Sequence, residues 1–210
     1  MSADGTSKVD PEKMRAGGVD AVVMSVAVGP GPRTMEGDAK ARAEADEKIA
    51  AVHTLVEESQ GQVVIATTSS EIVAAHEAGK SALILGFQNA RSLQGNVSAI
   101  DEFYAEGVRI FGLNHLGHNA FSDSSRPEFS GETGAFEVTE EHGGLSSLGV
   151  AAVERINALG ALVDVSQLSK AATLQVLELT SSPIIASHSN AKTVSDVTRN
   201  LSDEEIDRIG

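Results

Sequence analysis

The sequence predicts an α/β protein built on a parallel β-sheet. Six short runs rich in Val, Ile, Leu and Ala recur along the 210 residues, and each has the length of a strand that is buried on both faces. They cover residues 19–28, 62–68, 81–88, 108–115, 161–167 and 183–189. Helical patterns lie between most of these runs. Alternation of this kind predicts either a doubly wound sheet or a (β/α)8 barrel.

The longest helical pattern, residues 34–61, is charged on one side, carries apolar residues at helical spacing and closes on Gly61. The others follow the same plan, several with a Ser or Asn ahead and a Gly after, and cover residues 69–80, 96–107, 146–160 and 169–182. One long irregular stretch, residues 116–144, directly follows a strand, where barrels place their active-site loops. We interpret it as an insertion within a single domain that spans residues 1–210.

The amino-acid composition excludes some classes of binding partner and some kinds of metal ligand. Thirty acidic residues against sixteen basic ones give a formal charge of −14, which repels nucleic acid and anionic membrane surfaces, so neither is an expected partner. Cysteine is absent, so any metal must use His, carboxylate or amide ligands. No run approaches the roughly 18 apolar residues of a membrane span, and the opening residues have no apolar signal segment. We therefore expect a soluble, cytoplasmic protein.

Polar side chains stand at the ends of four predicted strands. Because parallel α/β folds place their sites at the carboxyl ends of the strands, we expect these side chains to meet in one pocket. The alternative is that each of them caps a helix or satisfies a loop amide. The residues concerned are Gln88, Asn89, Asn114, His115, Asp164, Gln167 and His188.

Other chemistry-bearing residues carry less weight. His53 and His76 fall inside charged helical patterns and are expected to be solvated. His118 and His142 lie in the long loop, and two roles are open for each of them: contact with a substrate, or a position on the surface without a function. Acidic residues whose spacing fits no metal-binding motif, such as Asp123 and Asp196, are expected to be solvated charges. No lysine ends a strand, and neither a Walker loop nor GxGxxG occurs, which disfavours Schiff-base and nucleotide chemistry.

Two long segments carry a family resemblance. The stretches "GGLSSLGVAAVERINALGALVDVSQLS" and "SSPIIASHSNAKTVSDVTRNLSDEEI" resemble the renal, or membrane, dipeptidase family of zinc-dependent (β/α)8 barrel hydrolases. The similarity continues upstream through "AGGVDAVVMSV", "SALILGFQNARSL" and "EGVRIFGLNH". It implies an incomplete TIM-type barrel with about six βα units, which lacks the first and last strands. It also implies metal-dependent hydrolysis of the peptide bond in a dipeptide or a related small amide.

The resemblance assigns a metal site with one or two zinc ions. His188 matches a metal-ligating histidine at a strand end. Gln88 stands where the family has a glutamate that bridges two metals, and Gln167 stands where it has a second strand-end histidine. An amide is a neutral and weak zinc ligand, so these two positions predict an altered site. The family's HxD pair has no counterpart, because no histidine precedes "VDPEKMRAGG".

The resemblance also assigns residues that bind the substrate. His115 matches the histidine that polarises the scissile carbonyl, Arg199 matches the arginine that pairs with the dipeptide carboxylate, and Asn119 is expected to contact the substrate. The strand with the family's proton-transfer aspartate would follow Gly210. We therefore expect little or no turnover from these 210 residues alone, and self-association through unpaired strand edges.

Two alternatives stay open at this point. The first is a catalytically silent, small-molecule-binding homologue that has lost its metal site. The second is an unrelated α/β enzyme that uses Asp164 or His115 as a general base without metal.

Overall fold

Six parallel strands form the central sheet of the computed structural model, which describes residues 10–130 and 133–210. They are β1 Ala21–Ala27, β2 Val63–Ile65, β3 Ser81–Gln88, β4 Val108–Gly112, β7 Leu162–Asp164 and β8 Ile184–Ile185. All six predicted strands are confirmed. β3 covers its whole run, residues 81–88, and the other five strands are shorter, because the last residues of their runs already belong to the loops that follow.

Five of these strands follow one another across the sheet in the order β1-β3-β4-β7-β8. β1 pairs with one edge of β3 from Ala82 to Gln88. On the opposite edge, β2 pairs only with Ser81–Leu83, while β4 pairs from Leu85 onward. β2 therefore lies off the main path, and the sheet is not closed within the described residues. The first strand that the sequence was expected to lack would precede Asp10, and residues 1–9 lie outside that part of the chain.

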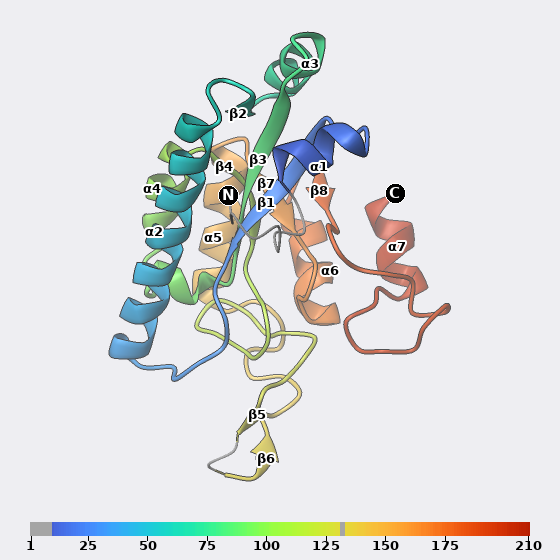
Figure 1. The fold of residues 1–210 in the computed structure, drawn as a ribbon. Coiled ribbons are helices and arrows are strands. Elements are labelled where there is room, and N and C mark those ends of the chain that lie inside the picture. Colours follow the sequence, from blue (N-terminus) through green and yellow to red (C-terminus); the bar gives the residue numbers. More distant parts are fainter. Residues whose placement is uncertain (1–9, 131–132) are drawn as a thin grey trace.

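Helices alternate with the strands. They are α1 Pro11–Ala16, α2 Met35–Glu58, α3 Ser69–Glu77, α4 Ala99–Ala105, α5 Ser147–Ala158, α6 Lys170–Leu179, α7 Asp203–Ile209 and the short 3-10 turn η1 Ala90–Leu93. In Figure 1, α2, α4 and α5 lie to the left of the strands while α6 and α7 lie to the right. Side-chain oxygens cap the first turns of most of them, as the sequence predicts: Thr34 caps α2, Ser146 caps α5 and Ser169 caps α6. None of the described helices has the length and apolar character that crossing a membrane would require.

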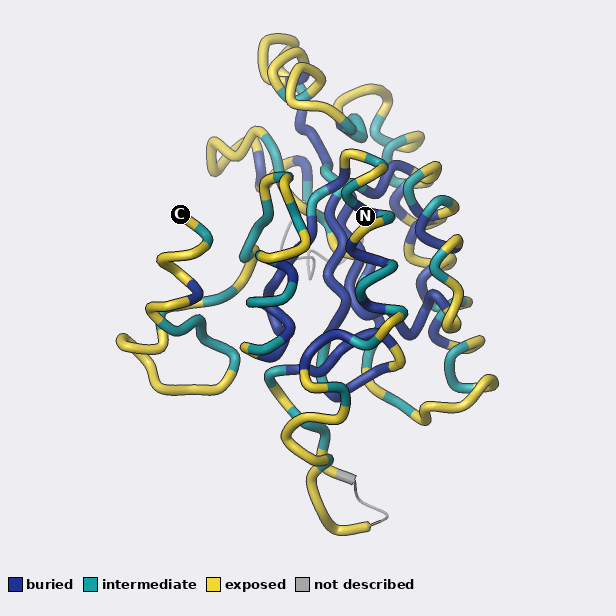
Figure 2. The backbone as a smooth tube through the Cα atoms, turned by 180° about the vertical axis from the view of Figure 1, so that it is seen from behind, coloured by how far each residue is buried: buried dark blue, intermediate teal, exposed yellow. Residues whose placement is uncertain are grey.

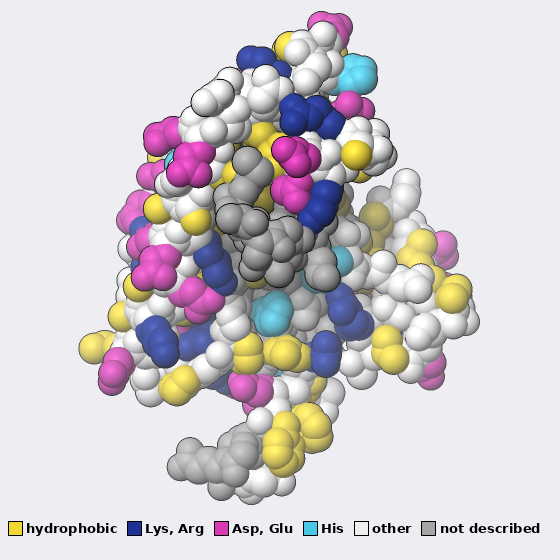
Figure 3. Space-filling view, in the orientation of Figure 1, with side chains coloured by type: hydrophobic (Ala, Val, Ile, Leu, Met, Phe, Trp, Pro, Cys, Tyr) yellow, Lys and Arg dark blue, Asp and Glu magenta, His cyan; other side chains and the backbone are white. Residues whose placement is uncertain are grey.

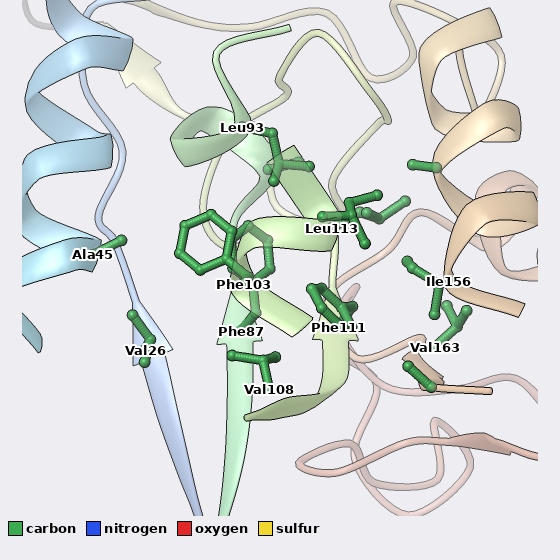
Figure 4. Close-up of a cluster of buried hydrophobic side chains, with 14 of the residues drawn as sticks. Val26, Ala45, Phe87, Leu93, Phe103, Val108, Phe111, Leu113, Ile156 and Val163 are labelled. Carbon is green, nitrogen blue, oxygen red and sulfur yellow. The ribbon is translucent and has the colours of Figure 1, made fainter. Parts of the chain in front are cut away.

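The apolar core lies between the sheet and these helices. Phe87 of β3 packs edge-on against Phe103 of α4, with ring centroids 4.8 Å apart. The ring of Phe111 of β4 lies on another side of Phe87, at 5.5 Å between centroids (Figure 4). In Figure 2 the buried residues, drawn in dark blue, follow the strands and the inner sides of the helices. Because side chains alternate along a strand, Gln88 points away from the helical face that Phe87 occupies. The core thus fixes which face of the sheet carries polar side chains.

The loop of residues 116–144 has structure of its own. It carries an antiparallel hairpin, β5 Phe129–Ser130 and β6 Ala135–Phe136, which projects from the body of the protein (Figure 1). At its base, Asp123 is fully buried and its carboxylate accepts the backbone N–H groups of Glu141, His142 and Gly144 at 2.9–3.1 Å. The expectation of a solvated Asp123 is therefore wrong, since three donors replace the lost hydration. Asp196, in contrast, is exposed as expected.

His118 belongs to the same buried framework. Its side chain is inaccessible to solvent, its Nδ1 accepts the N–H of Ser124 at 3.0 Å, and its Nε2 lies 2.7 Å from the carbonyl oxygen of Val138. Each ring nitrogen therefore has a backbone partner. His118 is not a surface residue, and its contacts hold the loop together.

Candidate functional site

The strand register brings polar side chains to one level of the sheet. Gln88 aligns with Gly112, Gly112 with Asp164, and Asp164 with Ile185. Gln167 and His188 each lie three residues beyond the aligned pair Asp164 and Ile185. The carboxyl ends of β3, β7 and β8 therefore carry their polar residues to the same edge.

Three of the predicted site residues contact one another there. Gln88 Nε2 donates a hydrogen bond to Gln167 Oε1 at 2.6 Å. His188 Nε2 lies 3.0 Å from Gln167 Oε1 and 3.3 Å from Gln88 Nε2. Both glutamines are buried, while the His188 side chain is 39% exposed. This amide–imidazole cluster, Gln88, Gln167 and His188, opens to solvent at its histidine.

The His188 ring is held from its other side. Ser187 Oγ donates to Asp164 Oδ2 and lies 2.7 Å from His188 Nδ1. The N–H of His188 donates to Ser166 Oγ at 3.1 Å, and Asp164 Oδ1 accepts the N–H groups of Ser166 and Ser187. Asp164 therefore satisfies loop amides, which is the alternative that the sequence left open for it, and it positions the imidazole through Ser187.

The backbone is strained beside the cluster. Gln167 has a φ of +69° and Asn89 a φ of +86°, in the region that non-glycine residues seldom adopt. The carbonyl of Gln167 accepts the N–H of Ser125 at 2.9 Å, and Asn89 Nδ2 donates to the carbonyl of Val28 at 3.1 Å. Such strain costs roughly 1–3 kcal/mol per residue and is concentrated at functional sites. Gln60 and Gln94 also have a positive φ, so this backbone conformation accompanies the cluster without being confined to it.

His115 lies at the same edge and is half-buried. Within the described residues, its Nδ1 is buried without a hydrogen-bond partner. Burial is the first cause that lowers the pKa of His115, and electrostatic repulsion from His188, Arg126, Arg199 and Lys48 lowers it further. Arg199 approaches the cluster directly, since its Nη2 donates to the carbonyl oxygen of His188 at 2.8 Å. Figure 3 shows a histidine near the middle of this face with Lys or Arg side chains on both sides.

Asn119 is buried and contacts Asn89, the residue that follows Gln88 in the chain. It is 1% exposed, and its Nδ2 donates to Asn89 Oδ1 at 3.2 Å and to the carbonyl of Leu113 at 2.7 Å. Its Oδ1 accepts the N–H groups of Phe121 and Ser122. These bonds fix the start of the long loop, and the expected contact of Asn119 with a substrate stays a prediction.

The remaining histidines divide as follows. His53 and His76 lie on α2 and α3 with side chains that are 41% and 63% exposed, as expected. His142 donates its N–H to Asp123 and places its Nε2 2.9 Å from the carbonyl oxygen of Asn119, so it stiffens the loop. Lys48 and Arg126, whose charges lower the pKa of His115, could not be found from the sequence, because neither stands at a strand end.

The sequence model of one known protein family matches the chain from residue 1 to residue 210. That family is described as membrane dipeptidase, peptidase family M19. The chain belongs to this family. The resemblance that the motifs carried is thereby confirmed.

Curated members of the membrane dipeptidase family align with most of the chain. Dipeptidase verJ of Clonostachys rogersoniana is 31% identical over 163 residues, which are 78% of this chain and 39% of the relative. Dipeptidase aclJ of Aspergillus oryzae is 33% identical over 129 residues, which are 61% of this chain and 28% of the relative. The chain thus spans less than half the length of these relatives.

Solved structures of the family share the fold. The probable dipeptidase PvdM from Pseudomonas aeruginosa superposes with a TM-score of 0.92 and 33% identity over 99% of this chain and 52% of its own. A metallopeptidase from Rhodobacter sphaeroides, liganded with a phosphinate mimic of the dipeptide L-Ala-D-Ala, gives a TM-score of 0.85 at 23% identity, covering 100% of this chain and 64% of its own. The latter likeness shows the fold alone.

The residues described here do not fit the zinc centre that a dipeptidase of this family implies. No group of three or more His, Cys, Asp or Glu side chains within residues 10–130 and 133–210 could hold a metal ion. Of the three expected ligands, only His188 offers a donor that zinc prefers. The two glutamines are neutral, and one of them donates to the other. We therefore derive no step of a reaction through a metal at this cluster.

The lowered pKa of His115 makes a testable prediction. We expect an NMR titration of this ring to give a midpoint below the ordinary 6.5, and the midpoint to rise in Arg126→Gln because one nearby positive charge is removed. Since the folded pKa lies below the unfolded one, His115 should reduce stability as the pH falls through 6.5 toward the folded pKa. Lys80→Gln, at the opposite end of β3, is the control. A midpoint at or above 6.5 in the wild type would contradict this.

Proposed function

We propose that this family member binds a dipeptide or a related small amide at the carboxyl edge of its sheet and hydrolyses the peptide bond. One observation carries the proposal: His115, from the loop after β4, meets His188 and Arg199, from the loop after β8, at that edge in a dipeptidase-family fold. Ligands of open parallel α/β sheets and barrels bind at this edge.

The three residues offer a dipeptide complementary contacts. A guanidinium can pair with a terminal carboxylate through two parallel hydrogen bonds, which suits Arg199. Burial lowers the pKa of His115 and so favours the neutral ring, whose N–H can donate to the scissile carbonyl. His188, held by Ser187 and Gln167, completes the group of polar side chains at this edge.

A second candidate function is ligand binding without hydrolysis. The observation that favours it is the donor set, in which two neutral amides occupy the positions where the family resemblance places an acidic and an imidazole ligand. This candidate keeps the same pocket and the same ligand class. It agrees with the expectation of little or no turnover.

Calorimetric titration with L-Ala-D-Ala, followed by an assay for released alanine, separates these candidates. We expect saturable binding that Arg199→Met weakens by about 10- to 100-fold, the worth of hydrogen bonds to a charged group. Lys80→Met is the matched control and should leave binding unchanged. Binding with alanine release supports the hydrolase, and binding without release supports the second candidate. Absence of binding would contradict both.

Two further properties belong to the same proposal. A cytoplasmic location rests on the composition, and self-association rests on the free edges of β1 and β8 in the described sheet. Analytical ultracentrifugation over a range of protein concentrations tests the second.

A further inference from the structure

A cavity of about 500 Å³ lies beside the candidate site. Three segments that follow β1, β4 and β8 line it, and they contribute Pro30, Leu116, Arg126, Phe129, Phe136 and Thr198. Leu116 follows His115 in the chain and Thr198 precedes Arg199, so this side pocket has two lining residues that are chain neighbours of candidate site residues. Its volume falls within the roughly 300–1,000 Å³ of sites for drug-sized ligands. A small dipeptide alone leaves much of it empty.

One wall of the side pocket is aromatic. Phe129 and Phe136 pack edge to face across the β5–β6 hairpin, with ring centroids 5.1 Å apart. They remain 54% and 70% exposed, although burial of such rings is favourable. Hydrophobic side chains gather on the surface of this projecting hairpin (Figure 3). Two adjacent exposed rings beside a cavity are typical of a ligand-binding surface.

The side pocket also contains the guanidinium of Arg126, and the carboxylates of Glu128 and Glu137 line the same pocket. In the described ranges, the Arg126 guanidinium forms no hydrogen bond and no ion pair. The neighbouring carboxylate of Glu137 is already engaged, because its Oε2 accepts the N–H groups of His118 and Glu128 and its Oε1 lies 3.6 Å from Arg33. A guanidinium beside apolar walls can lie over the face of an aromatic ring, which attracts it electrostatically.

We infer that this side pocket selects ligands whose carboxylate-bearing residue has a large aromatic side chain. The carboxylate would lie at Arg199, and the ring would extend past Thr198 between Arg126 and the two phenylalanines. The inference rests on the proposed function, because it assigns a specificity to the same ligand. It adds Phe129, Phe136 and Arg126 as determinants of that specificity.

The test compares L-Ala-D-Phe with L-Ala-D-Ala by calorimetry on the wild type, Phe136→Ala and Phe136→Tyr. We expect the wild type to bind the phenylalanine ligand about tenfold more tightly, the factor that partial burial of one ring supplies. Phe136→Ala should reduce the ratio to about two or less without changing the L-Ala-D-Ala affinity, and Phe136→Tyr should retain it. Phe136 is exposed, so its truncation does not threaten the fold.

Val73→Ala, an exposed apolar truncation on α3, is the control and should leave the ratio at the wild-type value. Equal affinities for the two ligands in the wild type would overturn the inference and leave the proposed function standing. A preference that persists unchanged in Phe136→Ala would also overturn it. If neither ligand binds, the proposed function itself fails.

Discussion

A double variant, Gln88→Glu with Gln167→His, is expected to bind zinc at least about 100-fold more tightly than the wild-type protein. The substitutions add a negative charge and a second imidazole beside His188, and both are ligands that zinc prefers. Changes to groups that merely orient metal ligands alter affinity by about 10–100-fold, so changing two direct ligands should exceed that range. Competition with a chromophoric chelator gives the dissociation constants, and elemental analysis gives the metal content.

The third member of the cluster provides the control for this result. Adding His188→Ala to the double variant should return zinc affinity to the wild-type level, while each single substitution should fall in between. Circular dichroism establishes that the variants remain folded. Zinc that stays bound in stoichiometric amount to the wild-type protein through dialysis against a chelator would contradict the expectation. It would mean that two amides and one imidazole are enough to bind zinc, or that residues outside this cluster provide further zinc ligands.

Asp123→Ala is expected to lower the free energy of unfolding by about 4 kcal/mol, the largest stability loss we predict. The substitution leaves three backbone N–H groups in the base of the loop without an acceptor, at about 1–3 kcal/mol each, and solvent can reach some of them. Urea unfolding followed by circular dichroism measures the change.

Two matched variants show whether the loss comes from the buried carboxylate. Asp196→Ala removes an exposed carboxylate and should change the free energy of unfolding by less than about 0.5 kcal/mol. Asp123→Asn keeps one acceptor oxygen and should fall between the two. If Asp123→Ala were no more harmful than Asp196→Ala, the loop would not depend on this carboxylate.

The strands were predictable because their residues carry the signal locally. The run of β3, "SALILGFQ", is buried at seven of its eight positions, and only a doubly covered strand requires such a sequence. The place of β2 was not predictable in this way. Its residues have the same apolar character, but strand order depends on which edge of β3 is free, and that is a property of the assembled sheet.

The site was predictable to the extent that strand ends reveal it. Gln88, Gln167 and His188 meet because parallel strands bring their carboxyl ends to one edge, and the sequence places each residue at such an end. Arg126 and the aromatic hairpin lie in a loop without periodicity, where no local rule indicates direction. Asp123 was misjudged for the same reason, since its three donors lie about twenty residues further along the chain.

The interpretation of residues 1–210 as one domain, and the roles of His115, Arg199 and Asn119 toward a ligand, remain predictions. They share one requirement, which is that the carboxyl edge of the sheet is where a dipeptide binds.

A competing place for a ligand is a second cavity of about 540 Å³, similar in volume to the side pocket. It lies between α2 and α4 on the helical side, and Arg42 and His53 line it.

A crystal structure of the protein soaked with L-Ala-D-Ala tests that requirement most directly. We expect the ligand at the carboxyl edge, with its carboxylate within hydrogen-bond distance of Arg199 and its carbonyl facing His115. A ligand bound between α2 and α4, or one that leaves Arg199 and His115 without contact, would contradict the account.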